Sequence, residues 1–108
     1  MAFHKKEIFT KKEQDLAEFS KALSHPARIA ILKQLAQKGA CTCNMLVDKL
    51  PLAQSTVSQH LNALKEAGLL EHSADGPRMY YAIDWKAWQK RSAGLLAQFD
   101  WFAERSEV

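Results

Sequence analysis

The stretch that decides the fold is residues 43–67, CNMLVDKLPLAQSTVSQHLNALKEA. Its first part predicts a short apolar helix that ends before Pro51, because the residue before a proline is driven out of the helical region. After about three connecting residues, Val57, Leu61 and Leu64 repeat at the spacing of one face of a second helix. Two helices joined this tightly predict a helix-turn-helix motif.

Two more helices are expected before this motif. Thr10 and Glu13 form a Ser/Thr-x-x-Glu capping box, so the first helix should begin near Lys11. Pro26 suits the first turn of a second helix, and Gly39 supplies its C-terminal stop. The motif therefore has helical material on its N-terminal side against which it can pack.

After the motif the pattern changes to that of a hairpin and then a last helix. Asp75-Gly76-Pro77 is a strong turn between two runs of strand character, and helical periodicity returns after Asp84. Because a lone hairpin is not stable in water, it must lie against the helices. The expected fold is mainly α with a small β-hairpin wing, a winged helix-turn-helix in the order four helices, hairpin, helix. We expect one domain over residues 1–108, with an N-terminal arm (1–10), the helix-turn-helix (43–67), the wing (69–83) and a C-terminal dimerisation helix (85–104).

Length and composition limit the classes of protein. A chain of 108 residues buries one modest core, which excludes most enzyme architectures. Cys43 and His60 are the only reactive pair that can be assembled, and no phosphate loop, nucleophile elbow or zinc-protease motif occurs, so we expect no enzyme. The chain has only two cysteines, and they are too close together to link distant segments by a disulfide. It also shows no apolar run long enough to cross a membrane and no secretory leader. We therefore expect a cytoplasmic protein with no membrane partner.

The second helix of the motif carries the candidate DNA-reading surface. With its apolar residues turned inward, its outer face is polar but barely charged. Amide side chains can pair bidentately with adenine, and hydroxyls reach bases or phosphates. An ordinary solvated helix face is the alternative, although such faces are usually richer in lysine and glutamate. The helix has no arginine, so we expect a half-site that leans towards A/T. The outer face consists of Gln54, Ser55, Ser58, Gln59, Asn62 and Lys65.

Basic groups around this helix are candidates for further DNA contacts. Lys49 and Lys65 are expected to touch phosphates, which fixes position without reading sequence. Arg78 follows the turn of the wing, where it either reaches the DNA backbone or minor groove or is ordinary surface. His60 lies between the apolar and polar sides, so a packed histidine bonded within the domain and a phosphate contact are both open.

Three segments together resemble a known family. They are ALSHPARIAIL (22–32), QSTVSQHL (54–61) and LKEAGLL (64–70), in an order and separation that closely resemble the ArsR/SmtB family of bacterial winged-helix repressors over roughly residues 12–84. The resemblance implies a homodimer that binds double-stranded DNA at an inverted-repeat operator and is released by an inducer, often a metal or metalloid. By position, it places Gln54, Ser55, Thr56, Ser58, Gln59 and His60 on the DNA-reading helix and Arg78 on the wing.

The last helix offers a surface for self-association. It carries more large apolar side chains than a monomer's surface helix normally shows, so pairing with the first and last helices of a second copy is expected. The alternative is that these side chains complete the core of one chain. Gly94, which costs about 1 kcal/mol in a helix interior relative to alanine, indicates a close helix crossing. The expected interface residues are Leu16, Phe19, Trp88, Leu95, Phe99 and Phe102.

Cys41 and Cys43 form a candidate sensor at the start of the helix before the reader. The resemblance implies thiolate ligands for a thiophilic metal or metalloid effector, and a helix N-terminus would lower the thiol pKa. The pair is an incomplete site, because Leu46 stands where the arsenic-type pattern has its third cysteine. His4 of a partner's arm or an exogenous thiol would have to complete it.

Other readings of the cysteine pair stay open. No histidine follows His72, so the family's zinc or nickel site on the last helix is not expected. Oxidation or persulfidation of the pair is one alternative to metal binding, and two small packing residues without any ligand are another. No cofactor is expected to be required.

The positive charge is unevenly distributed. Fifteen lysines and arginines against twelve acids give a net charge of +3 and a pI near 9.0. Residues 1–38 carry +4, residues 39–84 carry −2 and residues 85–108 carry +1. Specific recognition must therefore rest on amides and hydroxyls, with a shallow dependence on salt for a repressor dimer. A winged helix that mediates protein contacts without binding DNA is the competing class.

Overall fold

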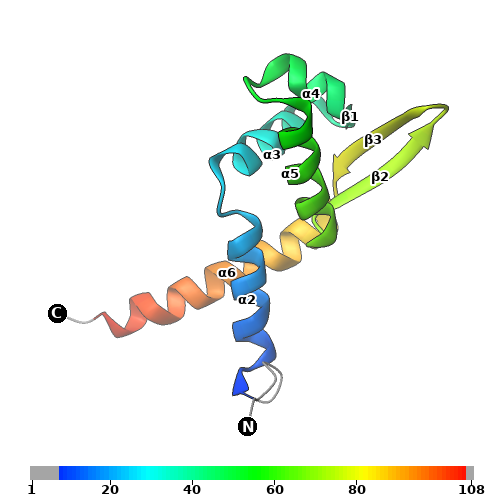
Figure 1. The fold of residues 1–108 in the computed structure, drawn as a ribbon. Coiled ribbons are helices and arrows are strands. Elements are labelled where there is room, and N and C mark those ends of the chain that lie inside the picture. The colour runs from blue at the N-terminus through cyan, green and yellow to red at the C-terminus, as the bar shows by residue number, and fades with distance from the viewer. Residues whose placement is uncertain (1–7, 107–108) are drawn as a thin grey trace, which may run out of the picture.

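A computed structural model describes residues 8–106, which form five helices and a small sheet whose hairpin projects to one side of them (Figure 1). The winged helix-turn-helix expected from the sequence is confirmed. In chain order the elements are α2 (Lys11–Ala22), α3 (Pro26–Lys38), β1 (Cys41–Thr42), α4 (Cys43–Lys49), α5 (Gln54–Glu66), β2 (Leu70–Asp75), β3 (Arg78–Ile83) and α6 (Trp85–Arg105).

Local sequence signals fix the helix ends. The Thr10 hydroxyl accepts from the Glu13 amide (3.1 Å), and the Glu13 carboxylate accepts in return from the Thr10 amide (2.9 Å), which completes the capping box at the start of α2. Pro26 occupies the first turn of α3, and Gly39 ends that helix with a φ of 83°. The chain can then turn into β1 and the helix-turn-helix.

The sheet contains one strand more than the expected hairpin. β2 and β3 pair antiparallel through a turn at Gly76, whose φ is 61°. β1 pairs with the other edge of β3, with Cys41 opposite Tyr81, so the strand order is β1-β3-β2. This two-residue strand joins the base of the wing to the start of α4.

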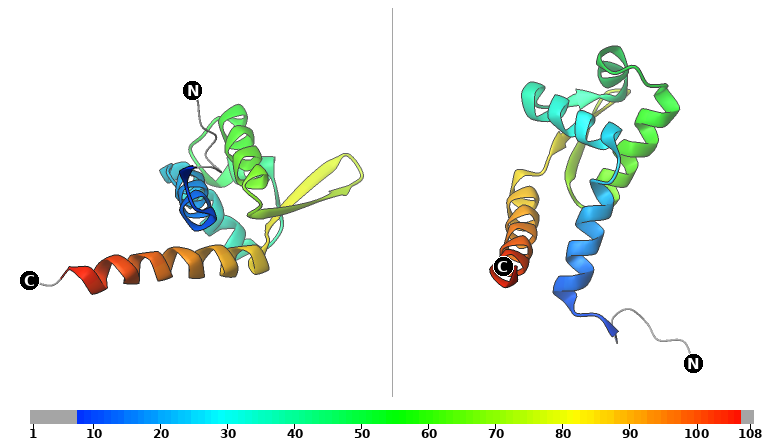
Figure 2. Two further views of the ribbon diagram at one scale, coloured as in Figure 1. Left: turned by 90° about the horizontal axis from the view of Figure 1, so that it is seen from below. Right: turned by 90° about the vertical axis from the view of Figure 1, so that its left-hand side faces the viewer.

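The core lies among α3, α4, α5 and the base of the sheet. α6 is held at its first half, where Trp88 packs edge to face on Phe19 of α2, with ring centroids 5.5 Å apart. The second half of α6 projects beyond the rest of the domain (Figure 2). The buried apolar residues are Phe19, Ala22, Ile31, Leu32, Leu35, Cys41, Leu46, Val57, Leu61, Leu64, Leu69, Leu70 and Ile83.

No helix within residues 8–106 combines the length and apolar character needed to cross a membrane.

Candidate nucleic-acid interface

α5 presents a polar face to solvent above a fully buried apolar stripe. Val57, Leu61 and Leu64 are at most 1% exposed and hold the helix against the core. Removing such a leucine from a core typically costs about 2–5 kcal/mol, so the orientation of α5 is firmly set. The exposed side chains are Gln54, Ser55, Ser58, Gln59, Asn62 and Lys65, and Thr56 is half-buried beside them.

α4 supports the N-terminal turn of this helix. The Cys43 thiol at the start of α4 donates to the carbonyl of Gln54 at 3.8 Å. Ala53 precedes α5 and makes no side-chain capping bond to its first amides. Unpaired amides at a helix N-terminus favour anionic groups, which suits a helix end that meets a phosphate backbone.

The C-terminal end of the polar α5 face and the wing are arranged differently. Asn62 donates from its amide to the Glu66 carboxylate at 3.3 Å, so it is the one amide of this face whose side chain is already bonded along α5. Lys65 lies exposed in the last turn. Arg78 lies opposite Asp75 beside the turn of the wing, which extends away from the helices (Figure 1). The structure thus collects the α5 residues on one helix and places Arg78 on a separate projection.

His60 is tied to the scaffold by an arginine from α3. Arg28 donates through Nε to His60 Nδ1 at 3.1 Å, and its Nη1 also donates to the carbonyls of Lys21 (3.3 Å) and Ala22 (3.4 Å). The His25 ring lies 5.2 Å from the His60 ring. One guanidinium therefore joins the end of α2, the start of α3 and the middle of α5. We call this arrangement the Arg28 corner.

The Arg28 corner fixes the protonation state of His60. Arginine has no acceptor and stays charged, so the bonded Nδ1 must be unprotonated. Burial, followed by the positive charges of Arg28 and His25, lowers the pKa of His60 below its ordinary value. His60 is thus a histidine bonded within the domain, and only its other ring nitrogen could reach DNA. Arg28 and His60 are 32 residues apart, so no helical or strand periodicity in the sequence could predict their hydrogen bond.

The cysteine pair lies at the start of α4, where the sequence predicted it, but its thiols do not have the expected lowered pKa. Cys41 is buried in β1 opposite Tyr81, and α4 begins only at Cys43. Burial raises the pKa of both thiols, with Lys38 opposing the shift at Cys41, where a helix N-terminus had been expected to lower it. In the part of the chain that the structure describes, no three His, Cys, Asp or Glu side chains are placed to hold a metal ion, and His4 lies outside that part. Within residues 8–106, the cysteine pair therefore has no third ligand from its own chain.

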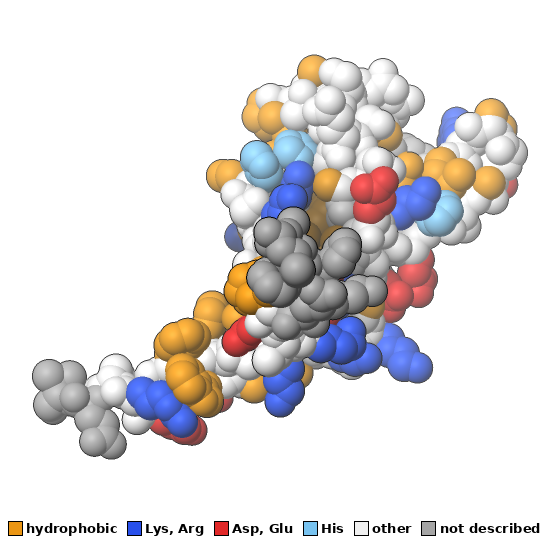
Figure 3. Space-filling view, turned by 60° about the horizontal axis from the view of Figure 1, so that its bottom comes forward, with side chains coloured by type: hydrophobic (Ala, Val, Ile, Leu, Met, Phe, Trp, Pro, Cys, Tyr) orange, Lys and Arg blue, Asp and Glu red, His pale blue; other side chains and the backbone are white. Residues whose placement is uncertain are grey.

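The expected dimer residues divide into two groups. Phe19 is 2% exposed and belongs to the core of one chain, which corrects its assignment to an interface. Trp88 and Leu95 also pack against this core, and Leu16 is half-buried, because α6 crosses α2 there. Phe99 and Phe102 are 56% and 61% exposed on the projecting half of α6, together with Leu96 and Trp101. Hydrophobic side chains along this projection are visible in Figure 3.

Comparison with known proteins agrees with the winged-helix architecture. A family model described as a helix-turn-helix domain matches residues 23–73. An uncharacterized HTH-type transcriptional regulator of Methanocaldococcus jannaschii is 41% identical over 75 residues, which are 68% of this chain and 83% of the relative. The transcriptional repressor PagR of Bacillus anthracis is 35% identical over 71 residues, covering 66% of this chain and 71% of the relative.

A solved structure extends the similarity to most of the fold. An ArsR-like transcriptional regulator from Rhodococcus sp. RHA1 superposes with a TM-score of 0.74 at 27% identity, over 86% of this chain and 87% of that one. The family model's match over residues 23–73 contains almost all of the three segments that carry the family resemblance. The chain belongs to the ArsR/SmtB family of winged helix-turn-helix transcriptional regulators, a family of DNA-binding proteins.

Proposed function

We propose that this chain acts as a homodimeric transcriptional repressor whose two α5 helices read the half-sites of an inverted-repeat operator. The observation that carries the proposal is the exposed row of amides and hydroxyls on α5, held in place by side chains that are at most 1% exposed. Two such helices about 34 Å apart would enter successive major grooves on one side of a duplex. Gln54 and Gln59 are the candidates for adenine contacts.

The surface of α6 supports the dimeric part of the proposal. Its projecting half exposes Leu96, Phe99, Trp101 and Phe102, although a single chain normally covers such groups. Two copies related by a twofold axis would bury these side chains against each other. The twofold would also give the palindromic arrangement that an inverted repeat requires.

Binding to DNA from the chain's own promoter tests the proposal. Fluorescence anisotropy at several salt concentrations should show specific binding that weakens as salt rises, because phosphate contacts release counterions. Gln59→Ala should alter base preference at one operator position per half-site and weaken binding by about 1–3 kcal/mol. Gln37→Ala, which alters an exposed glutamine of α3, is the matched control and should leave binding unchanged.

Two results would contradict the proposal. DNA binding that is indifferent to salt, or absent altogether, would favour a winged helix that mediates protein contacts. A Gln59 variant with unchanged preference, beside a Lys65→Ala variant that changes it, would show that another side chain reads the bases.

A further inference from the structure

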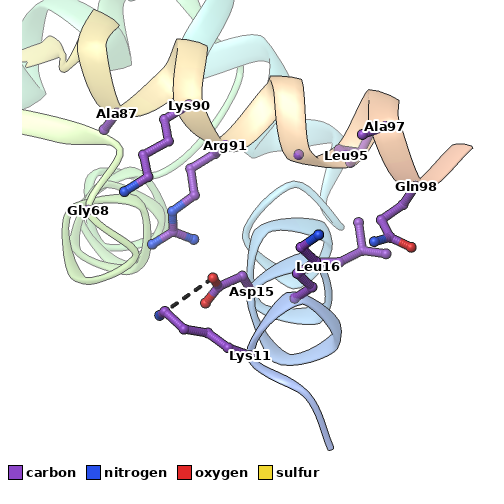
Figure 4. Close-up of a pocket in the computed structure, with 12 residues that line it drawn as sticks. Lys11, Asp15, Leu16, Gly68, Ala87, Lys90, Arg91, Leu95, Ala97 and Gln98 are labelled. Carbon is purple, nitrogen blue, oxygen red and sulfur yellow. Dashed lines mark ion pairs between the residues drawn. The ribbon is translucent and has the colours of Figure 1, made fainter. Parts of the chain in front are cut away.

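A cavity with cationic walls lies between α2 and α6, beside the C-terminal end of α5. It has a volume of about 540 Å³, within the range of small-molecule sites. Figure 4 shows Lys90 and Arg91 of α6 directed to the end of the cavity near Gly68, with the Lys11–Asp15 pair on the α2 wall. Leu16 and Leu95 add apolar lining. The cavity thus combines a charged end with an apolar wall.

The charges in this cavity are not balanced by the chain. Lys11 pairs with Asp15 at 3.5 Å, but Lys12 and Lys90 form no ion pair within residues 8–106. One carboxylate therefore faces four cationic side chains. Such a surplus around a partly open cleft favours the entry of an anion.

Arg91 supplies a second, independent sign of a missing partner. Its Nη2 donates to the carbonyl of Ala67 at 3.1 Å, which anchors the guanidinium at the end of α5. Its Nη1 is buried and has no hydrogen-bond partner among the described residues. A buried donor without an acceptor is costly, and a charged one more so. Because Nη1 has almost no exposed surface, an anionic oxygen in the cavity reaches it only if the guanidinium rotates, and it then forms the second bond that a guanidinium offers to a carboxylate or phosphate.

Gly94 keeps this cavity open. The sequence indicated a close helix crossing at this glycine, but a Cβ built there meets no atom within 4 Å. The glycine instead lines the cavity, in the helical turn after Arg91. At about 100° per residue, Leu96 and Phe99 point away from the cavity side of α6. Trp101 and Phe102 lie towards the side of Gly94, but about 10–12 Å further along the helix, beyond the residues that line the cavity.

We propose that this cavity is a binding site for a small organic anion, whose carboxylate or phosphate lies at Arg91 and Lys90 and whose apolar body lies along Leu16 and Leu95. The anionic head supplies the acceptor that Arg91 lacks and balances the excess positive charge. Because Arg91 also donates a hydrogen bond to Ala67 at the end of α5, a bound anion that shifts the guanidinium would also shift the last turn of that helix. The site itself does not depend on DNA binding, so it can be tested on the protein alone.

Calorimetric titration of the full chain with three probes of equal chain length tests the proposal. Hexanoate and hexyl phosphate carry the two possible heads, and 1-hexanol carries none. We expect a dissociation constant of about 0.1–1 mM for at least one anion, as suits a ligand of this size, and no measurable binding of the alcohol. The tighter of the two anions assigns the head group. Failure of both anions to bind, or equal binding of hexanol, would overturn the proposal.

Matched variants of α6 locate the site. Gly94→Leu fills part of the cavity without altering its charge. Lys90→Gln removes one positive charge from the cavity lining. Each variant should raise the dissociation constant of the anion by about tenfold or more. Ala93→Leu and Lys86→Gln make the same changes on α6 outside the cavity lining and should leave binding within about twofold of the original. Circular dichroism confirms that each variant is folded. Equal weakening by the cavity variants and their controls would show that the anion binds elsewhere.

Discussion

Replacement of Phe99 by alanine tests whether the projecting half of α6 is a pairing surface. A phenylalanine side chain buries about 150–250 Å² when fully covered, and Phe99 is 56% exposed in the single chain. Covering the exposed part in a dimer therefore removes about 110 Å² of apolar surface per chain and about 220 Å² per dimer. At about 25 cal/mol per Å², this burial contributes about 5.5 kcal/mol as an upper limit.

Alanine keeps part of that contact, so we expect Phe99→Ala to weaken dimerisation by about 3–5 kcal/mol, or two to nearly four orders of magnitude in the dissociation constant. Sedimentation equilibrium over a wide concentration range measures this shift directly. Met79→Ala is the control, because it removes an apolar side chain that is 39% exposed on the wing, far from α6. Unchanged self-association of the Phe99 variant, with an unchanged far-ultraviolet spectrum, would refute the assignment of this surface.

Three further predictions concern stability and reactivity. The pKa of His60 is 6.5 in the unfolded chain and lower in the folded chain, so the unfolded state takes up the proton first as the pH falls. The folded chain therefore loses stability from pH 6.5 down to the folded-state pKa of His60. The free energy of unfolding in urea should depend less on pH in His60→Gln than in the original chain. Gly94→Ala should stabilise the chain by about 0.5–1 kcal/mol in the same assay, whereas Gly68→Ala, at a φ of 78°, should destabilise it by about 1 kcal/mol. Cys43 should be alkylated before the buried Cys41 at neutral pH, with both rates rising at higher pH because burial raises both thiol pKa values; mass spectrometry would contradict this if Cys41 reacted first.

Local signals were sufficient to predict most of the secondary structure. The Thr10 capping box, the prolines at 26 and 51 and the apolar spacing of Val57 and Leu61 each act within a few residues, and the observed helices begin and end accordingly. β1 was missed because two residues are too short to show a period, and its existence depends on the distant edge of β3.

Features that depend on spatial proximity could not be read from the pattern. An apolar helix face does not reveal whether it meets its own chain or another, so Phe19 and Phe99 looked alike although only Phe19 is buried. The Arg28 bond to His60 joins helices whose residues are remote in sequence. The cavity beside Gly94 was likewise hidden, because a glycine can mark either close approach or open space.

The Arg28 corner also means that the residues of α5 differ in how freely they can be substituted during evolution. A mutation at Gln54 or Gln59 changes an exposed amide and leaves the core of the domain intact. A mutation at His60 withdraws the acceptor from a guanidinium that also closes the end of α2. If α5 reads the operator as proposed, a duplicated gene can acquire a new operator by exchanging the exposed amides alone, while the histidine that anchors the helix is inherited as part of the scaffold.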